Sequence, residues 1–572
     1  MTKSVDTPAD SPRPGSRAAR VRMPLAADVV QEAAVAHGVC VRPVAMKVTD
    51  TTTGEITFVD VPCGSTLAAK CPTCAERARR LRMHQCREGW HLDTEPDLDA
   101  DSPSPVHLRL ATERADITSA RDDLAAAGET GAVVAVVESL ADVDTELRRA
   151  GVRGNVEPTT RQRRVRSTRR RNDAPDLPRR EMQPTTLGRT FTGHDGEVFR
   201  PSMFLTVTLP SYGRVRGDGT PVDPDAYDYR RAARDALAFS RLLDRLVQNL
   251  RRVAGYDVQY FATVEPQRRL AAHAHFAIRG TIPRATLRRV VAATYHQVWW
   301  PAVDEPMYSA DRAPVWTSDR GYVDPVTGRP LTTWDDALDQ FDDDARPRHV
   351  ARFGSQVDVQ GLLAGTQDAD RRIGYLAKYL TKSMTDAHDT DDTATSARRV
   401  HVDRLHSELL IEPCSAACAN WLRYGVQPKN ARDGMTPGGC RSKAHRRAHL
   451  GYGGRRILVS RKWSGKTLAD HRHDRRAWVL TTLGVPVDDA ARANDKTRDR
   501  FVWEHAGQHD DVRPLPTRLL HAIAERARWR AAYEAAKRGD PPPIASPSGV
   551  NTTLTPDAGS SAMPTHGRDT AA

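Results

Sequence analysis

The spacing of apolar and polar residues predicts a regular series of strands and helices between residues 203 and 300. The β-branched run MFLTVTLPSYG is typical of a strand that ends at Pro210 and Gly213. Residues 230–255 place Ala, Leu and Val at helical intervals and close on Gly255. DVQYFATVE and AAHAHFAIRG then predict a hairpin, and PRATLRRVVAATYHQVWW predicts another amphipathic helix. The order strand, helix, hairpin, helix indicates an α+β fold with helices against an antiparallel sheet.

The rest of the chain divides by composition. Residues 92–195 are polar, with a possible helical pair in SARDDLAAAGE and VAVVESLADVDTELRRAG before a basic arm, and a solvated linker explains them equally well. The acidic, Trp- and Pro-rich stretch at 301–350 is expected to be an excursion from the α+β domain. The predicted division is a disordered segment at 1–35, a zinc-binding module at 36–91, a linker with a basic arm at 92–195, the α+β domain at 196–384, a linker at 385–398, a basic Cys/His module at 399–480, a helical segment at 481–535 and a disordered tail at 536–572.

Charge and composition favour a polyanionic partner, with nucleic acid as the first candidate. The 572 residues include 85 Lys and Arg against 73 Asp and Glu, a formal net charge of +12. No apolar run approaches the roughly 18 to 20 residues that a membrane span needs, and the polar start lacks a signal-peptide core, so we expect a cytoplasmic protein with no membrane partner. Eight cysteines are too few for a disulfide scaffold.

Two histidines one residue apart predict a catalytic metal site. Alternate residues of a strand share a face, so His273 and His275 can bind one cation while the residues between and after them face the core. A third ligand is expected from the neighbouring strand of the hairpin, with Glu265 as first choice and Gln267 as second. Mg²⁺ or Mn²⁺ held there would make a phosphodiester more electrophilic. An isolated H-x-H pattern also fits two ordinary strand histidines.

A helix predicted in IGYLAKYLTKSM carries two candidate nucleophiles. Tyr375 and Tyr379 are four residues apart and so share one face. A phenol with a pKa of about 10 is a poor nucleophile at neutral pH without help. Lys378 and Lys382 lie one turn away, and either could screen the phenolate or hold the phosphate, with Lys382 preferred. The first tyrosine could take the 5′ end and the second could attack the site regenerated after copying; an ordinary amphipathic helix is the alternative.

Two cysteine clusters have the spacing of zinc sites. The first is Cys40, Cys63, Cys71 and Cys74, with Cys86 and His84 as possible replacements for Cys40. The second is Cys414, Cys418 and Cys440 with His445 or His449. Four ligands close a tetrahedron, so we expect structural Zn²⁺ rather than a catalytic site with an open position. Free, reduced cysteines are the alternative.

Basic residues after the second cluster are candidates for contact with the DNA backbone. These are Arg455, Arg456, Arg461, Lys462 and Lys466, with Trp463 expected to stack on an unpaired base. A solvated basic face explains the same residues. The sequence ILVSRKWSGKT lacks the first glycine of a phosphate-binding loop, where it has Ser460, so a host helicase would have to unwind the DNA.

Together, HAHFAIRG and YLAKYLTK resemble the HUH endonuclease superfamily, and the two-tyrosine pattern is similar to that of rolling-circle initiators of single-stranded DNA phages. Longer segments resemble the replication initiators of actinobacterial plasmids and integrative elements: FLTVTLPSYGRV, AFSRLLDRLVQNLRR, YFATVEPQRRLAAHAHFAIRG, IGYLAKYLTKS, CANWLRYGVQPKNARDG and HLGYGGRRILVSRKWSGKTLADHR. The resemblance covers most of residues 200–480 and the N-terminal cysteines, but not 92–195.

This resemblance implies an HUH-type central antiparallel sheet flanked by helices. It implies a metal at His273 and His275, a nucleophile among Tyr375 and Tyr379, and a support strand at Thr206 to Leu209. We therefore expect a rolling-circle replication initiator that nicks origin DNA, forming a 5′-phosphotyrosine and a free 3′-OH for a host polymerase.

Three alternatives stay open: a conjugative relaxase, an HUH transposase and a non-catalytic zinc-containing DNA-binding regulator. Relaxases usually place the tyrosine ahead of the histidines, whereas here both tyrosines follow them. A regulator explains the cysteines and the charge but not the histidine pair with the tyrosines.

Overall fold

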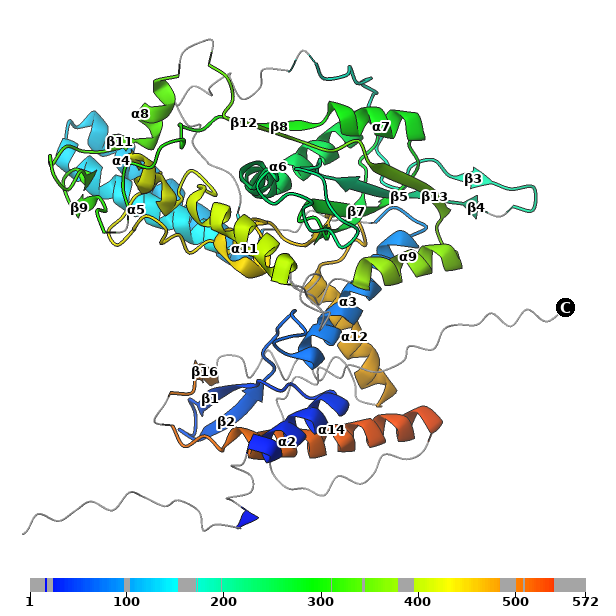
Figure 1. The fold of residues 1–572 in the computed structure, drawn as a ribbon. Coiled ribbons are helices and arrows are strands. Elements are labelled where there is room, and N and C mark those ends of the chain that lie inside the picture. Colours follow the sequence, from blue (N-terminus) through cyan, green and yellow to red (C-terminus); the bar gives the residue numbers. More distant parts are fainter. Residues whose placement is uncertain are drawn as a thin grey trace, which may run out of the picture. The chain divides into compact units, whose positions relative to one another are not determined.

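The computed structural model describes residues 16–17, 24–96, 103–152, 171, 173–196, 198–309, 311–341, 345–378, 396–483, 500–507 and 510–539. The chain forms two compact units, one made of Met1–Glu95 with Asp173–Ala572 and the other of Pro96–Asn172 (Figure 1). The predicted linker at 385–398 and the tail at 536–572 lie largely outside the described residues. No helix in the described part of the chain has the length and apolar character needed to cross a membrane.

The largest sheet in the described residues has five strands, each antiparallel to its neighbours. In spatial order the strands are β13 (Val357–Leu363), β5 (Pro201–Thr208), β7 (Ala272–Arg279), β6 (Tyr260–Pro266) and β15 (Ile457–Val459). The predicted strand at 203 and the predicted hairpin are β5, β6 and β7. The edge strand β15 comes from the segment that the sequence placed in a separate basic module.

One face of this sheet packs on the helices α6 (Tyr229–Ala254) and α7 (Arg284–Ala293). Leu205, Val207, Ala274 and Phe276 are fully buried there, as strand alternation predicts for the residues between the histidines. Helix α6 begins where Asp228 accepts a hydrogen bond from the Arg231 amide, and it ends at Gly255 in a left-handed conformation. The predicted combination of an antiparallel sheet with flanking helices is therefore confirmed.

The opposite face packs on α3 (Pro72–Trp90) and α9 (Gln367–Lys378). Phe204, Phe261 and Ala277 of the sheet meet Trp463 in this cluster. The indole of Trp463 has no exposed surface, and its N–H donates to the Cys86 carbonyl at 3.2 Å. The expectation that Trp463 stacks on an unpaired base is therefore wrong, because the packing of α3 against the sheet removes this side chain from solvent.

The predicted helix at 283–300 is too long. Helix α7 ends at Ala293, and β8 (Tyr295–Val298) pairs with β12 (His349–Arg352) instead. Thr294 is already extended, with φ −92° and ψ 124°, and it begins a run of β-branched and aromatic residues that favours a strand. Long-range pairing thus replaces the last turns of the predicted helix.

The excursion at 301–350 folds onto the segment after 411. It contains β9 (Val315–Thr317), β10 (Gly321–Val323), β11 (Thr332–Thr333) and α8 (Trp334–Asp339). Strand β11 pairs in parallel with β14 (Val426–Gln427). The rings of Trp334 and Trp421 lie 4.9 Å apart between centroids, so aromatic packing holds the excursion in place. The segment from 396 to 449 contains α11 (Ser396–Ile411), η2 (Ala419–Tyr424), η3 (Lys443–His445) and η4 (Arg447–His449). Elsewhere, β3 (Phe191–Thr192) and β4 (Val198–Phe199) pair only with each other among the described strands.

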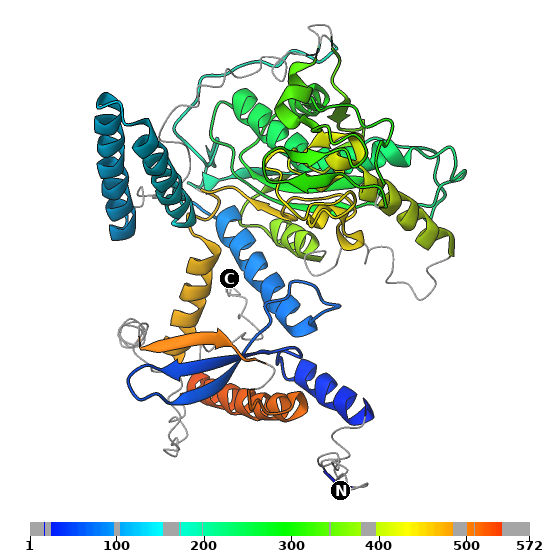
Figure 2. The ribbon, with the colours of Figure 1, turned by 90° about the vertical axis from the view of Figure 1, so that its left-hand side faces the viewer.

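Segments from the two ends of the sequence form a second sheet. Its order is β16 (Phe501–His505), β1 (Val44–Asp50) and β2 (Ile56–Val61), and Figure 2 shows β16 in orange beside the two blue strands. Arg500 joins the ends with an ion pair to Asp50 at 2.6 Å. The helices α2 (Pro24–Ala36), α14 (Leu515–Arg538) and α12 (Leu468–Thr482) belong to the same unit. The reading of residues 481–535 as helical missed β16.

The second unit is a helical hairpin in the residues that the structure describes. Helices α4 (Pro105–Ala126) and α5 (Thr130–Arg149) pack through Leu110, Val143 and Leu147. Arg114 Nε and Asp144 Oδ1 lie 2.7 Å apart between the helices. The possible helical pair is confirmed, and both helices begin earlier than the quoted segments. Most of the predicted basic arm lies outside the described residues.

Buried His401 predicts that acid weakens the fold. Its side chain is 2% exposed, and the Tyr229 hydroxyl lies 2.7 Å from its Nδ1. Burial lowers the pKa of His401 to about 4, whereas an unfolded histidine titrates near 6.5. Between these values the unfolded chain binds more protons, so the free energy of unfolding falls as pH decreases.

The wild-type protein should therefore lose free energy of unfolding between pH 7 and pH 5. We expect this loss to be smaller by about 2 kcal/mol in His401→Gln, because glutamine does not titrate. Chemical denaturation at both pH values measures this difference. Substitution of the exposed His521 should leave the loss unchanged, and an equal loss in all three proteins would contradict the assignment.

Candidate active site and metal centres

Two imidazoles and a carboxylate meet on the sheet face that carries α3 and α9. His273 and His275 lie on β7, and the strand register places Glu265 of β6 directly opposite His273. The Nε2 atoms of the two histidines are 2.9 Å apart, and the Glu265 carboxylate oxygens lie 3.6 Å from His273 Nε2 and 3.8 Å from His275 Nε2. All three side chains are buried, and their ligand atoms lie within 4.8 Å of one another. This group could hold one metal ion.

Neighbouring contacts suit the group to a cation. Thr206 Oγ1 lies 2.9 Å from His275 Nδ1, so the other ring nitrogen of His275 points into the group, as in metal-ligating histidines. Burial, together with the nearby His273 and Arg372, lowers the pKa of His275 to about 3, so this imidazole is neutral, as ligation requires. Glu265 Oε1 is buried without a hydrogen-bond partner among the described residues.

Gln267, the second choice for the third ligand, is engaged in the hairpin turn. Its Oε1 accepts a hydrogen bond from Arg269 Nε at 2.7 Å. The carboxylate that the register brings to the histidines is Glu265.

Tyr375 is the tyrosine that the described structure places at this group. Its hydroxyl lies 3.5 Å from His275 Nε2, and its ring packs edge-on against Phe204 with centroids 6.1 Å apart. Helix α9 is anchored through buried Ile373 and Leu376, which leaves Tyr375 on its flank with 38% of the residue exposed. The phenol thus reaches the imidazoles, while the residue as a whole stays partly exposed to solvent. Lys378 is exposed in the last described turn, while Tyr379 and Lys382 lie outside the described residues.

Sequence reasoning missed two side chains around Tyr375. Phe204 stacks on His275 with ring planes 22° apart, and the Arg372 guanidinium lies 5.3 Å from the centre of the Phe204 ring. Arg372 is three residues before Tyr375, so helical spacing places both on neighbouring positions of one helix. That spacing was the available signal for Arg372. Strand alternation was the signal for Phe204, because it puts Phe204 on the same face of β5 as Thr206, the residue opposite His275.

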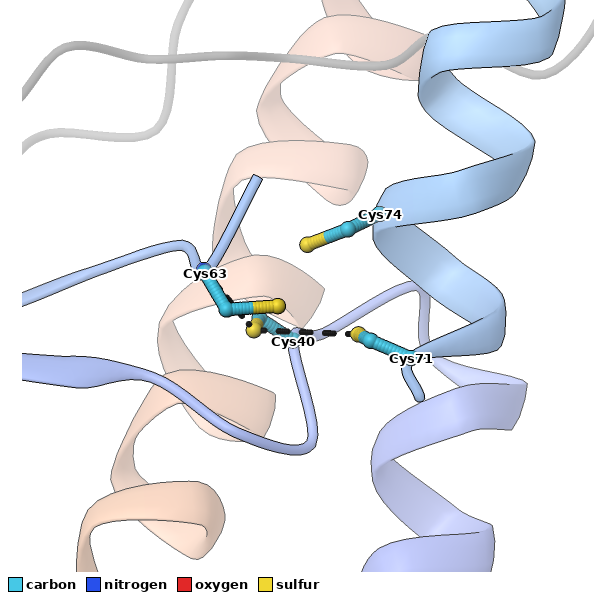
Figure 3. A group of neighbouring side chains, drawn as sticks. All are labelled: Cys40, Cys63, Cys71 and Cys74. Atoms are coloured by element: carbon cyan, nitrogen blue, oxygen red, sulfur yellow. Dashed lines mark hydrogen bonds between the residues drawn. The ribbon is translucent and has the colours of Figure 1, made fainter. Parts of the chain in front are cut away.

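The N-terminal cysteines form a compact group (Figure 3). Cys71 precedes α3 and Cys74 lies in its first turn, while Cys40 and Cys63 come from loops. The sulfurs of Cys71 and Cys40 are 3.8 Å apart, and the Cys63 amide donates to Cys40 Sγ at 3.3 Å. A hydrogen bond from Cys74 lowers the pKa of Cys40 to about 5 and so favours the thiolate, the form that binds zinc. The four residues could hold Zn²⁺.

The proposed replacements for Cys40 lie elsewhere. Cys86 is buried in the aromatic cluster around Trp463, and His84 faces Glu88 and His471. The structure therefore supports the four-cysteine set and not the alternative with Cys86 and His84.

The second cysteine cluster forms a Cys₃His group. Cys414 and Cys440 sulfurs are 3.9 Å apart, and Cys418 Sγ lies 3.4 Å from His445 Nε2. His445 Nδ1 donates to the Leu409 carbonyl at 2.6 Å, which directs Nε2 toward the sulfurs. This set could also hold Zn²⁺, and it contains His445 rather than the alternative His449.

The predicted DNA-binding residues differ in their surroundings. Arg455, Arg461, Lys462 and Lys466 are exposed, whereas Arg456 is partly buried and donates to the Val264 carbonyl at 3.3 Å. Lys466 pairs with Glu88 at 2.8 Å and Asp474 at 2.9 Å, and Lys462 Nζ lies 3.9 Å from an Asp257 carboxylate oxygen. Part of this positive charge is therefore compensated within the protein. DNA contact by these residues stays a prediction.

The chain is similar to a known class of proteins, the replication initiators. A family model of that class matches residues 26–525. The family is RepSA, described as the replication initiator protein of pSAM2, and this chain belongs to it. No curated protein and no solved structure matches the chain. The predicted family of actinobacterial plasmid and integrative-element initiators is confirmed, and membership implies interaction with origin DNA.

The four-cysteine group predicts metal content that can be measured. Cys71→Ala should remove one equivalent of Zn²⁺ from the purified protein and lower its melting temperature, because an incomplete tetrahedron binds zinc weakly. Elemental analysis and thermal unfolding measure both effects. Cys86→Ala is the matched control, since this thiol is equally buried but lies outside the group. Zinc lost from Cys86→Ala and retained in Cys71→Ala would refute this ligand set.

Proposed function

We propose that this replication initiator is an HUH-type, metal-dependent endonuclease that cuts one strand of its origin by tyrosine attack. The observation that carries the proposal is the placement of the Tyr375 hydroxyl 3.5 Å from His275 Nε2, beside the Glu265–His273–His275 group. A nucleophile and a cation site that lie side by side are the two parts that phosphodiester cleavage requires. A DNA-binding regulator without catalysis gives no reason for this arrangement.

The donor set fits Mg²⁺ or Mn²⁺ with a preference for the latter, because imidazole nitrogens are softer than the oxygen ligands that Mg²⁺ selects. Three protein ligands leave coordination positions for phosphate oxygens. A bound cation would withdraw charge from the non-bridging oxygens of the scissile phosphate. Thr206 fixes the ring of His275, and Phe204 stacks on it, so the ligand geometry is held by the sheet.

The tyrosine step can be written from the residues present. Tyr375 gives its phenolic proton to water, and its oxygen forms a bond to phosphorus as the bond between phosphorus and the 3′-oxygen breaks. The 3′-oxygen takes up a proton and becomes the free 3′-OH that a host polymerase extends, while the 5′ phosphate stays on the tyrosine. Arg372, whose guanidinium lies 5.3 Å from the centre of the Phe204 ring, would supply positive charge near this position, and Lys378, one turn after Tyr375 on α9, would add to it. Tyr379 would serve as the second nucleophile and Lys382 as its partner.

The remaining groups serve binding and stability in this proposal. The two cysteine groups hold structural Zn²⁺, and exposed basic residues such as Arg455 and Arg461 contact the origin backbone. Unwinding requires a host helicase, and the reaction takes place in the cytoplasm. A relaxase or transposase would share the centre, but the matched family is one of replication initiators.

The nucleophile is tested by covalent trapping. A labelled single-stranded origin oligonucleotide incubated with Mn²⁺ should form an adduct with wild-type protein and none with the Tyr375→Phe, Tyr379→Phe double variant, because both phenol oxygens are gone. Denaturing electrophoresis and peptide mapping identify the attached residue. Tyr533→Phe, the same change in α14, should behave as wild type. An adduct in the double variant would reject the assignment.

The third ligand is tested by metal affinity. Glu265→Gln should weaken Mn²⁺ binding by at least about tenfold, since even changes beyond the ligands cost that much in metal sites. Electron paramagnetic resonance of free Mn²⁺ measures the change, and nicking of a supercoiled origin plasmid should fall with it. Gln267→Ala is the control, because its side chain is used in the turn. A control that loses Mn²⁺ while Glu265→Gln retains it would show that the ligand is Gln267.

A further inference from the structure

A separate group of metal-ligating side chains lies between α3 and α12. It consists of His84, Glu88 and His471, whose ligand atoms lie within 4.8 Å of one another. His84 and Glu88 are four residues apart on α3 and so share a face, and His471 comes from the first turn of α12. None of them belongs to the candidate active centre or to either cysteine group.

One carboxylate oxygen faces both imidazoles. Glu88 Oε2 lies 3.1 Å from His471 Nδ1 and 3.5 Å from His84 Nε2, and the two rings are nearly perpendicular with centroids 5.7 Å apart. Two nitrogens and one oxygen therefore converge from three side chains. This is the composition of His₂Glu zinc sites, in which the fourth position is open.

The strongest sign of a ligand is the state of His471. Its side chain has no exposed surface, and Nδ1 has no hydrogen bond of normal geometry among the described residues. The other ring nitrogen, Nε2, lies 2.9 Å from the Ser464 hydroxyl. A metal-ligating histidine uses one nitrogen for the ion and the other for a polar neighbour that fixes its orientation. His471 has this arrangement, with the unsatisfied nitrogen aimed into the group.

The surrounding packing holds the two helices at this separation. Trp463 lies against Gly89 so closely that a Cβ at Gly89 would meet the indole at 2.2 Å. The same indole donates to the Cys86 carbonyl, so α3 and the chain entering α12 are fixed at two points next to Glu88. The ligand positions therefore do not depend on flexible loops.

Charges around the group are compatible with a cation. Lys466 pairs with Glu88 Oε1, the oxygen that does not face the imidazoles, and also with Asp474. Lys466 thus orients the Glu88 carboxylate, and Asp474 offsets the positive charge of Lys466.

We propose that His84, Glu88 and His471 bind a Zn²⁺-type transition-metal ion that fastens α12 to α3. His84 and Glu88 keep 29% and 25% of their side chains exposed, which leaves a solvent side where water can complete the coordination. The ion ties α3, which carries Cys71 and Cys74 at its start, to α12, whose Trp478 ring packs on Tyr533 of α14. The site acts on the structure, and it is independent of the proposed nuclease centre.

The test compares four full-length proteins: wild type, His84→Gln, Glu88→Gln and the control His473→Gln. His473 is an exposed histidine on α12. Each protein is loaded with Co²⁺ in place of Zn²⁺, dialysed and analysed for bound metal and for its absorption spectrum. We expect His84→Gln and Glu88→Gln to bind one Co²⁺ fewer than wild type and control. Their sulfur-to-cobalt charge-transfer bands should be unchanged, because those bands arise from the cysteine groups. Equal metal content in all four proteins, with the bands intact, would overturn the proposal.

If a variant also loses the charge-transfer bands, the substitution has disturbed the cysteine groups as well as this site. The Ser464→Ala variant then tests the proposal, because it retains all three ligands and removes only the hydroxyl that orients His471. Metal is first removed from the Ser464→Ala protein with a chelator, and the protein is then titrated with Zn²⁺. The Zn²⁺ affinity of the His84–Glu88–His471 site should be about 10- to 100-fold lower than in wild type. An unchanged affinity would overturn the proposal.

Discussion

The register of β7 between β5 and β6 is the constraint on which the rest of the centre depends. In that register Thr206 and Thr263 flank His275, and Glu265 faces His273. A slip of one residue would exchange the two faces of the strand. Ala274 and Phe276 would then face α3 and α9, and the histidines would enter the core beneath α6. Burial of these apolar side chains therefore fixes where the imidazoles point.

The cysteine groups occur where the apolar core is small. The N-terminal group sits among few buried residues, such as Val39 and Leu519, and joins loops that are distant in sequence. The Cys₃His group likewise lies beside a cluster of aromatic residues around Trp421 and Trp334. Small modules bury too little apolar surface to fold strongly alone, and metal ligation is a common supplement. The two cysteine groups therefore lie where a bound metal ion would add most to the stability of the fold.

Local sequence signals predicted much of the candidate centre. Strand alternation placed His273 and His275 on one face, and the short turn of the hairpin brought Glu265 beside them. Features that depend on distant partners could not be predicted in this way. Strand β16 exists because it pairs with β1, and Trp463 is buried because α3 covers it. Likewise, His471 acquires its neighbours from a helix almost 400 residues earlier, and no local pattern records that contact.

Helix α3 connects the parts of this unit. It starts at the cysteine group, carries His84 and Glu88 in its C-terminal half, and ends with Trp90 packed in the cluster on the α3 and α9 face of the sheet. Near that end, Arg87 Nε lies 2.9 Å from Asp370 Oδ1 in the first turn of α9, the helix that presents Tyr375. The ion pair is exposed and contributes little energy alone. The shared aromatic cluster supplies the stronger link, because Ile373 and Leu376 of α9 pack in it with Cys86 and Trp90. The position of the tyrosine therefore depends on apolar packing between two helices on the same sheet face, and α3 owes its own position to contacts at both of its ends.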